Sequence, residues 1–282
     1  MIRLSRATAE PAVELVEVSG ATFRVAIHDG EPGGTPLLLF NGIGASLETF
    51  GPFLDALDPA RPVIRLDVPG IGGSPMPARP YRFSTLSRSI GRLLDRLEVS
   101  EVDVLGISWG GALAQQFALT ERKRVRRIVL VATSTGSISV PANPFVLAHL
   151  ATPRRHRDPA HMMSIAGTIY GGSLRQHQDH LKDLLPYFGR GGQKGGYALQ
   201  LLAGAGWTSV PFLPLIRQPI LILAGDDDPI ISSLNGRIIA RLSRHSELVT
   251  YHGGHIDLVA NPGELVPHIE RFLAEPLPAS SV

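Results

Sequence analysis

The sequence predicts an α/β fold, a doubly wound and mostly parallel sheet with a mostly helical segment inserted late in the chain. Short, continuously apolar runs, typical of strands buried on both faces, recur along the sequence. Helical patterns separate these runs, and such alternation indicates parallel strands with helices on both faces of the sheet. The alternation stops between residues 137 and 214 and resumes after them.

The first strands are expected at residues 14–18 and 23–28, joined through Ser19 and Gly20 into an antiparallel hairpin at the sheet edge. Apolar runs then predict buried strands at residues 36–40, 62–67, 102–107 and 125–132. Stripes of apolar residues and runs of helix formers, with Ser46 as the cap of the first helix, predict helices at residues 47–57, 86–97 and 112–119.

After the break, a strand, a helix, a strand and a helix are expected at residues 220–224, 234–242, 247–251 and 264–273. Residues 137–214 form a stretch too long for a plain loop and too irregular for β–α units. We interpret this stretch as a mostly helical lid, called the insertion below. It would separate two parts of one core, at residues 1–136 and 215–282.

The composition of the 282 residues excludes several kinds of function. Hydrophobic residues make up 44% and charged residues 18%, as in an ordinary folded globular protein. The chain has no cysteine, which excludes a disulfide, a thiol nucleophile and a thiolate metal site. A net charge of +2 gives no reason to expect nucleic-acid binding. The basic runs at residues 122–127 and 154–157 are interpreted as solvated faces, or alternatively as contacts with an anionic surface.

We expect the protein to be cytoplasmic. The first residues lack the apolar core of a signal peptide. No window of the sequence has the length and apolar character of a transmembrane helix, so no membrane-spanning segment is expected.

The most informative motif lies between a predicted strand and a predicted helix. Residues 106–110 read Gly-Ile-Ser-Trp-Gly and match G-x-S-x-G, the pattern of a tight turn that exposes a nucleophilic serine. Glycine at positions 106 and 110 lets the strand and helix approach closely. The turn leaves the Ser108 hydroxyl at a helix N-terminus, where a developing negative charge is favoured. Ser108 is therefore the predicted nucleophile.

A serine nucleophile needs a base, and the base needs an acid that orients it. In sheets of this kind the acid and then the histidine follow the serine in chain order. Asp228 is the predicted acid, because it is the third residue after the glycine that follows strand 220–224. Asp226 and Asp227 are interpreted as turn or capping residues. The loop at residues 133–137 contains no carboxylate, which favours Asp228.

The predicted base is His255, which follows a glycine in the loop after the last strand. His252, at the start of the same loop, is the alternative. The other histidines are interpreted as solvated or packing residues. The spacing of His177 and His180 is compatible with a metal, but two ligands without a third do not predict a site, and no metal is expected.

Attack on an ester carbonyl creates an oxyanion that requires preorganised donors. The backbone N–H of Trp109, directly after the nucleophile, is one expected donor. The other is expected from the loop after strand 36–40, at the N–H of Ile43, where Gly42 and Gly44 let the loop fold in closely. No phosphate-binding G-x-x-x-x-G-K-[ST] motif is present, and no cofactor is expected.

Together these residues resemble the α/β-hydrolase superfamily over nearly the whole chain. More narrowly, the sequence resembles the intracellular poly(3-hydroxyalkanoate) depolymerases of the medium-chain-length type. The stretches that carry the narrower resemblance lie both in the core and in the insertion, at residues 40–45, 67–74, 80–83, 106–118, 153–155, 168–172 and 205–209. The resemblance implies a serine ester hydrolase that depolymerises the polyester to 3-hydroxy acids or oligomers through an acyl-enzyme on Ser108.

The resemblance also implies a partner, the surface of the polymer granule. Two alternatives remain from the sequence. One is a soluble carboxylesterase or lactonase that acts on small esters, and the other is a non-catalytic granule-binding protein that kept the fold. The intact serine, acid and base favour an enzyme.

Three residues are expected to contact substrate. Asn41 replaces the histidine that many superfamily members carry before the oxyanion glycine, as in the similar depolymerases. Tyr170 and Trp207 lie in the most depolymerase-like parts of the insertion. They belong to a set of aromatic residues that either form an apolar route to Ser108 or pack the insertion onto the core, Phe145, Tyr170, Trp207 and Phe212. Asp257 departs from the family pattern, which has apolar residues after the histidine.

Overall fold

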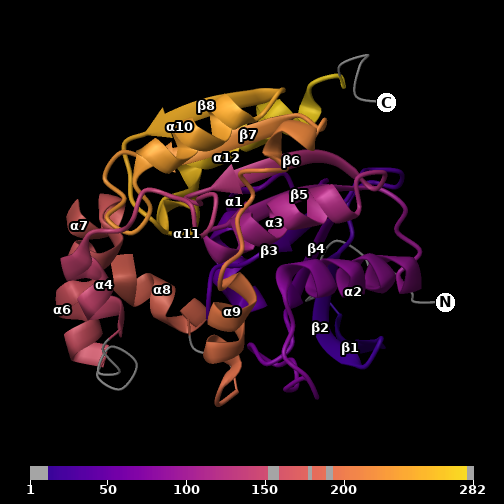
Figure 1. Cartoon of the computed structure of the whole chain (residues 1–282), viewed down its shortest axis with the longest axis horizontal. Coiled ribbons are helices and arrows are strands. Elements are labelled where there is room, and N and C mark those ends of the chain that lie inside the picture. The colour runs from indigo at the N-terminus through magenta and orange to yellow at the C-terminus, as the bar shows by residue number, and fades with distance from the viewer. Residues whose placement is uncertain (1–11, 152–158, 177–179, 189–192, 278–282) are drawn as a thin grey trace.

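The computed structural model describes residues 12–151, 159–176, 180–188 and 193–277. Within these residues, eight strands form one sheet in the order β1-β2-β4-β3-β5-β6-β7-β8 (Figure 1). The strands are β1 Val13–Val18, β2 Ala21–His28, β3 Leu37–Phe40, β4 Val63–Asp67, β5 Val102–Ile107, β6 Val125–Val131, β7 Ile220–Gly225 and β8 Ser246–Tyr251. β2 is antiparallel to β1 and β4, and every other pair of neighbours is parallel. The predicted doubly wound, mostly parallel sheet is confirmed.

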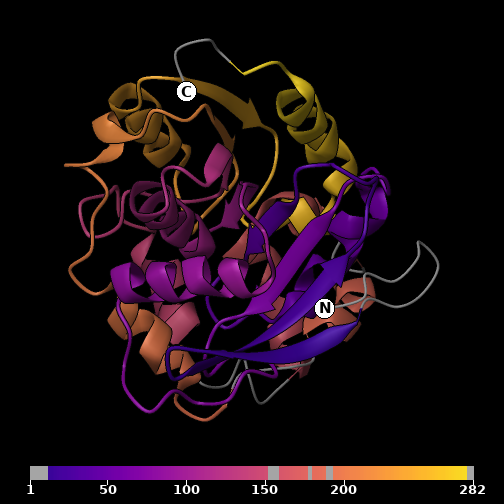
Figure 2. The ribbon, with the colours of Figure 1, turned by 90° about the vertical axis from the view of Figure 1, so that its right-hand side faces the viewer.

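Helices cover both faces of the sheet (Figure 2). The helices on one face are α2 Phe83–Arg96, α3 Trp109–Thr120 and α10 Ser233–Leu242. The opposite face is covered by α1 Gly51–Ala56, α11 Asp257–Ala260 and α12 Pro262–Ala274. A short 3₁₀ helix, η1 Leu47–Phe50, leads into α1. Among the described residues, no helix has the length and apolar character needed to cross a membrane.

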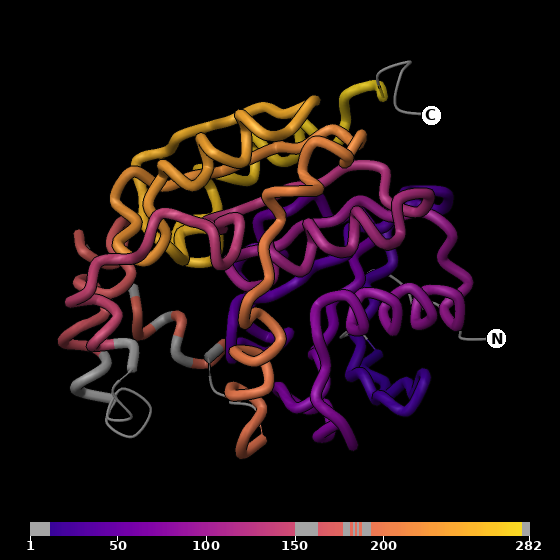
Figure 3. The backbone as a smooth tube through the Cα atoms, in the orientation of Figure 1, coloured from indigo at the N-terminus to yellow at the C-terminus, as the bar shows by residue number. Residues whose placement is uncertain are grey.

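The described part of the insertion is mostly helical, as predicted for this stretch. Between β6 and β7 it contains α4 Pro144–Ala151, α6 Pro159–Tyr170, α7 Gly172–Gln176, α8 His180–Phe188, α9 Gly196–Gly204 and the 3₁₀ helix η2 Leu213–Leu215. Figure 3 shows the chain leaving the sheet for these helices and returning past α3 to β7. The insertion therefore lies at the carboxyl ends of the parallel strands, where ligands bind in sheets of this kind.

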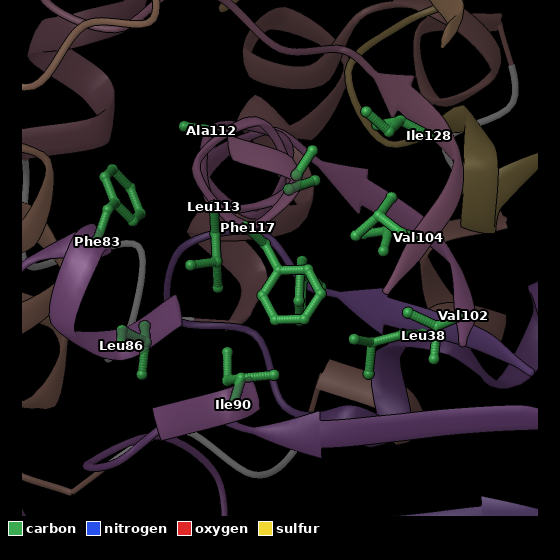
Figure 4. Close-up of a cluster of buried hydrophobic side chains, with 14 of the residues drawn as sticks. Leu38, Phe83, Leu86, Ile90, Val102, Val104, Ala112, Leu113, Phe117 and Ile128 are labelled. Carbon is green, nitrogen blue, oxygen red and sulfur yellow. The ribbon is translucent and has the colours of Figure 1, made fainter. Parts of the chain in front are cut away.

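Two apolar layers hold the sheet between its helices. Successive residues of a strand point to opposite faces, so Leu38 and Phe40 of β3 join one cluster while Leu37 and Leu39 join the other. Figure 4 shows the first layer, where side chains of α3 and α2 meet those of β3 and β5. The nearly continuous burial of the five strands β3 to β7 explains why their apolar runs predict them.

The start of the helix after β3 differs from the prediction. Ser46 occupies the N-cap position, but its side chain makes no capping hydrogen bond. The carboxylate of Asp67, at the end of β4, instead accepts a hydrogen bond from the backbone N–H of Leu47 at 2.7 Å. Asp67 also accepts the N–H of Gly73 at 2.8 Å and pairs with Arg24 at 3.1 Å. The carboxylate of Asp67, which is distant in the sequence, therefore caps the helix in place of the predicted Ser46.

The packing in Figure 4 predicts a large effect for Phe117→Ala. Phe117 is fully buried and packs edge-on against Phe40, with ring centroids 5.5 Å apart. We expect the variant to lose about 3–5 kcal/mol of the free energy of unfolding, because removing a buried phenylalanine leaves a cavity. Urea denaturation measures this loss. The control is Leu15→Ala at the exposed edge strand, for which a comparable loss would contradict the prediction.

Candidate active site

Ser108 lies on a sharp turn between β5 and α3. Its backbone φ of 55° and ψ of −118° are strained for a residue with a side chain. The two flanking glycines make the turn possible. A Cβ on Gly106 would overlap the carbonyl of Gly110, and a Cβ on Gly110 would overlap the carbonyl of Phe40. The G-x-S-x-G pattern therefore reflects backbone-to-backbone packing on both sides of the serine.

Hydrogen bonds fix the strained backbone. The N–H of Ser108 donates to the carbonyl of Val131 on β6 at 2.9 Å. Its own carbonyl accepts the Thr133 hydroxyl at 2.7 Å and the N–H of Gly111 at 2.9 Å. These bonds hold the backbone of Ser108 at the start of α3.

The structure brings together the three residues predicted as nucleophile, base and acid. Ser108 Oγ lies 3.1 Å from His255 Nε2, and His255 Nδ1 lies 2.9 Å from Asp228 Oδ2. The Asp228 and His255 side chains are buried, so a charge on this pair is shielded from water. Because an ionised carboxylate only accepts hydrogen bonds, Nδ1 carries the proton and Nε2 is free to accept one from the serine. This is the arrangement that activates a serine hydroxyl.

Backbone groups hold the predicted acid and the predicted base in place. The second carboxylate oxygen of Asp228 accepts the N–H groups of Ile230 and Ile231, each at 2.8 Å. The backbone N–H of His255 donates to the carbonyl of Tyr170, at the end of α6, at 2.7 Å. The insertion therefore contributes directly to the position of the histidine.

The residues next to the predicted acid and base, including the alternative base His252, have partners other than Ser108. His252 is exposed and pairs with Asp226 at 3.2 Å; hydrogen bonding to this carboxylate raises the pKa of His252. Asp227 accepts the N–H of Gly172 at 2.8 Å and pairs with Arg175 of the insertion. Neither His252 nor Asp226 has a hydrogen bond to Ser108 among the described residues.

Asp257, the departure from the family pattern, is buried and ties the histidine loop to the insertion. Its carboxylate accepts the N–H of Gly254 at 2.9 Å, the Ser173 hydroxyl at 2.6 Å and the Ser173 N–H at 3.3 Å. A Cβ on Gly172 would overlap the backbone of Gly254, so the two segments pack backbone to backbone. Nearby, burial raises the pKa of Tyr251 well above its usual value. Its hydroxyl stays protonated and donates to the carbonyl of Gly254 at 3.0 Å.

Trp109, which directly follows the serine, and the loop after β3 lie next to Ser108. Trp109 begins α3, so its N–H has no partner within the helix. The loop that contains Ile43 approaches Ser108 at Gly42, where a Cβ would lie 3.8 Å from the Cβ of Ser108. The Asn41 amide is engaged within this loop: it donates to the carbonyl of Ser46 at 2.6 Å and accepts the N–H of Gly42 at 2.9 Å. These contacts favour a loop-shaping role for Asn41 over substrate contact.

The aromatic residues of the insertion fall into two groups. The Trp207 ring lies between Phe83 and Phe212, with centroids 5.0 and 5.9 Å away, and its indole N–H donates to the Gln116 side chain at 2.9 Å. Tyr170 is half-buried against the apolar layer on the α12 side. These positions favour the interpretation that Trp207, Tyr170 and Phe212 pack the insertion onto the core. Phe145, by contrast, is 61% exposed.

Two features noted in the sequence lie outside the described residues, His177 of the histidine pair and the basic run at residues 154–157. Among the described residues, no group of three histidine, aspartate or glutamate side chains is placed to hold a metal ion.

The strand order, the strained serine turn and the hydrogen-bonded serine, histidine and aspartate define an α/β-fold hydrolase. Comparison with known families agrees, since residues 35–262 match the model of the α/β hydrolase fold family. The chain belongs to this family and is an ester-hydrolysing enzyme.

The relatives are consistent with a narrower assignment. A poly(3-hydroxyalkanoate) depolymerase of Ectopseudomonas oleovorans is 46% identical over 264 residues, which cover 92% of each chain. The 3-oxoadipate enol-lactonase 2 of Acinetobacter baylyi is 27% identical over 80% of this chain and 84% of its own. Among solved structures, a hydrolase from Pseudomonas aeruginosa matches with a TM-score of 0.76 and 26% identity, covering 93% of this chain and 98% of its own. The resemblance to the depolymerases inferred from the sequence is confirmed.

The sequence did not predict the residues of the insertion that contact the loops of the candidate site. Ser173 meets Asp257 across 84 positions of sequence, and Gln200 meets the loop after β3 across 156 positions. Neither forms a motif with its partner. The only local signals were the unusual Asp257 and the paired glycines at 171 and 172, which a close backbone approach explains.

The contacts of Asp257 predict that Asp257→Ala destabilises the protein and slows it. The change leaves buried donors of Gly254 and Ser173 without an acceptor, at an expected loss of about 1–3 kcal/mol. We also expect kcat to fall by about tenfold or more, because Gly254 precedes the histidine and small displacements of a catalytic group are costly. Thermal melting and steady-state kinetics measure the two effects. Ser173→Ala, which removes a single donor, is the milder matched variant; an Asp257→Ala protein with unchanged melting and kcat would refute the prediction.

Proposed function

We propose that this enzyme hydrolyses the ester bonds of an aliphatic poly(3-hydroxyalkanoate), or of its oligomers, to 3-hydroxy acids. The observation that carries the proposal is the hydrogen-bonded series of Ser108, His255 and Asp228 in a chain 46% identical to a poly(3-hydroxyalkanoate) depolymerase. Similarity of this extent over 92% of both chains covers the insertion as well as the core. The insertion is where members with one fold differ in substrate.

In the first half of the proposed reaction, Ser108 Oγ attacks the ester carbonyl while His255 Nε2 removes the hydroxyl proton. Asp228 stabilises the imidazolium that forms, because its carboxylate faces Nδ1 at 2.9 Å. The carbonyl oxygen becomes an oxyanion and accepts hydrogen bonds from the N–H groups of Ile43 and Trp109. Cleavage of the carbon–oxygen bond transfers the proton from His255 to the departing hydroxyl group and leaves an acyl group on Ser108.

In the second half, His255 removes a proton from a water molecule, which attacks the acyl carbonyl. The same two N–H groups stabilise the second oxyanion. Its collapse breaks the bond to Ser108 Oγ, which regains a proton from His255, and releases the carboxylic acid. The cycle returns the three side chains to their initial protonation and requires no cofactor.

We further propose that residues 137–214 act as the lid and contact the granule surface. Large apolar side chains are exposed on two of its helices, Phe145 and Leu147 on α4 and Leu201 and Leu202 on α9. A polyester with aliphatic side chains presents an apolar surface, so burying these residues against it would be favourable by about 25 cal/mol per Å².

A second candidate is a soluble carboxylesterase or lactonase acting on small esters. The 27% identity to an enol-lactonase over 80% of this chain favours it, although that similarity is weaker than the similarity to the depolymerase. The two candidates share the chemistry at Ser108 and differ in substrate. Acid release from washed polymer granules, compared with hydrolysis of a soluble short ester, distinguishes them.

Replacing the catalytic residues tests the chemistry. We expect Ser108→Ala, Asp228→Asn and His255→Ala each to lower kcat by about 10³-fold or more without unfolding the protein. The matched variants Asp226→Asn and His252→Ala alter an exposed pair and are expected to retain most of the activity. Hydrolysis of a chromogenic short ester measures all five. An active Ser108→Ala protein, or a His252→Ala protein more impaired than His255→Ala, would refute the assignment.

Replacing the exposed leucines of α9 tests the role of the lid. The double variant Leu201→Gln and Leu202→Gln removes apolar surface from two residues that are 55% and 52% exposed. We expect granule hydrolysis to fall several-fold more than hydrolysis of the soluble ester. Leu15→Gln changes a leucine on β1 that is 61% exposed and serves as the control. Equal losses on both substrates would contradict a granule-binding role for this helix.

A further inference from the structure

Gln200 is a buried polar residue of the insertion that the proposed reaction does not use. It lies on α9 and is only 1% exposed. A long amide is seldom buried without a specific partner, because an unpaired polar group is unfavourable in the interior. Its partners therefore indicate why the residue is there.

The Gln200 side chain is bound to the loop after β3. The N–H of Gly44 donates a hydrogen bond to Gln200 Oε1 at 2.6 Å. Gly44 directly follows Ile43, one of the two expected oxyanion donors, and has a left-handed φ of 76°. Because the partner is an N–H group, the amide oxygen and not the amide nitrogen faces the loop.

The backbone of the same residue is bound to the other oxyanion element. The carbonyl of Gln200 accepts a hydrogen bond from the indole N–H of Trp109 at 2.9 Å. Trp109 also packs against Phe83, with ring centroids 4.8 Å apart. The residue whose N–H is the second expected donor is thus anchored by its side chain to α9. Gln200 also lines, with Asn41, Gly42 and Trp109, a small cavity between the two elements.

We propose that Gln200 is a positioning residue that sets the spacing of the two oxyanion donors. It links the loop that carries Ile43 to the residue that carries the other N–H, and neither of these segments is bonded to the other directly among the described residues. The proposal rests on the proposed function, since it concerns the oxyanion of that reaction. Oxyanion stabilisation depends on donors that are already in place when the charge develops, so a displaced loop lowers the rate of the chemical step.

A positioning role and a simple packing role predict different effects of a substitution on kcat, KM and melting temperature. Losing a donor that acts only in the transition state lowers kcat and kcat/KM together and leaves KM unchanged. A packing defect instead lowers the melting temperature and does not act selectively on kcat. The affinity for a boronic acid is a second readout, because its tetrahedral adduct with Ser108 Oγ presents an oxygen to the same donors.

The test uses two variants of Gln200. Gln200→Met keeps the length of the side chain but has no amide oxygen for Gly44, and Gln200→Asn keeps the amide but shortens its reach by one methylene. Both retain the backbone carbonyl bonded to Trp109. With a soluble p-nitrophenyl ester we expect kcat to fall at least tenfold while KM stays within about threefold, and the Ki of an alkylboronic acid to rise by the factor lost in kcat/KM.

Gln218→Met is the matched control. Gln218 is also buried and its side chain donates to a backbone carbonyl, that of Arg122, at 2.7 Å, before the start of β7 and away from the serine turn. We expect this variant to lose stability but to keep the wild-type kcat and Ki.

Values of kcat and Ki within twofold of the wild type in the folded Gln200 variants would overturn the proposal, as would equal losses in Gln218→Met. If Gln200→Met does not fold, the kcat and Ki of Gln200→Asn test the proposal. Ser108→Ala separates this outcome from a failure of the proposed function. An inactive Ser108→Ala with unimpaired Gln200 variants rejects only the role of Gln200, whereas an active Ser108→Ala rejects both.

Discussion

The close approach of backbones around Ser108 is the constraint on which the rest of the structure depends. β5 enters the turn and α3 leaves it with no room for a side chain at Gly106 or Gly110. The turn holds Ser108 at a φ that is unfavourable for serine, and bonds to Val131 and Thr133 on the neighbouring chain segment stabilise it. The proposed nucleophile is therefore fixed by the middle of the sheet, and loops at the same end bring His255 and Asp228 to it.

The insertion contributes contacts to the candidate site and does not only cover it. Its carbonyl at Tyr170 bonds to the N–H of His255, and its Ser173 bonds to Asp257 in the same loop. Gln200, on another helix, bonds to Gly44 and to Trp109, in the two segments proposed to stabilise the oxyanion. A rigid movement of α7 or α9 away from the core would break these contacts and displace the proposed base or the proposed oxyanion donors. Substrate access is thus expected to leave these two attachments in place.

The sequence predicts the features that depend on residues close together in the chain. The buried strands appear as apolar runs, and Ser108, Asp228 and His255 each lie in a loop that directly follows a recognisable strand. The sequence did not predict contacts between distant positions, such as the contact between Gln200 and Gly44. These contacts depend on how the insertion returns to the core. The same distinction explains why Ser46 was expected to cap a helix that Asp67 caps instead. A capping pattern of neighbouring residues is visible in a sequence, whereas a carboxylate delivered by another strand is not.

Three buried carboxylates at the carboxyl ends of the strands show how similar groups acquire different roles. Asp67, Asp228 and Asp257 each accept hydrogen bonds from backbone N–H groups, which stabilise a buried negative charge and fix the loop that donates them. Asp67 adds an ion pair with Arg24, and Asp257 adds the Ser173 hydroxyl, so both complete their coordination with groups that do not titrate near neutral pH. Asp228 alone adds an imidazole, and this partner in turn lies within hydrogen-bond distance of a serine hydroxyl. Backbone N–H groups thus anchor all three carboxylates. The imidazole partner distinguishes Asp228, which is the carboxylate proposed to take part in the chemistry.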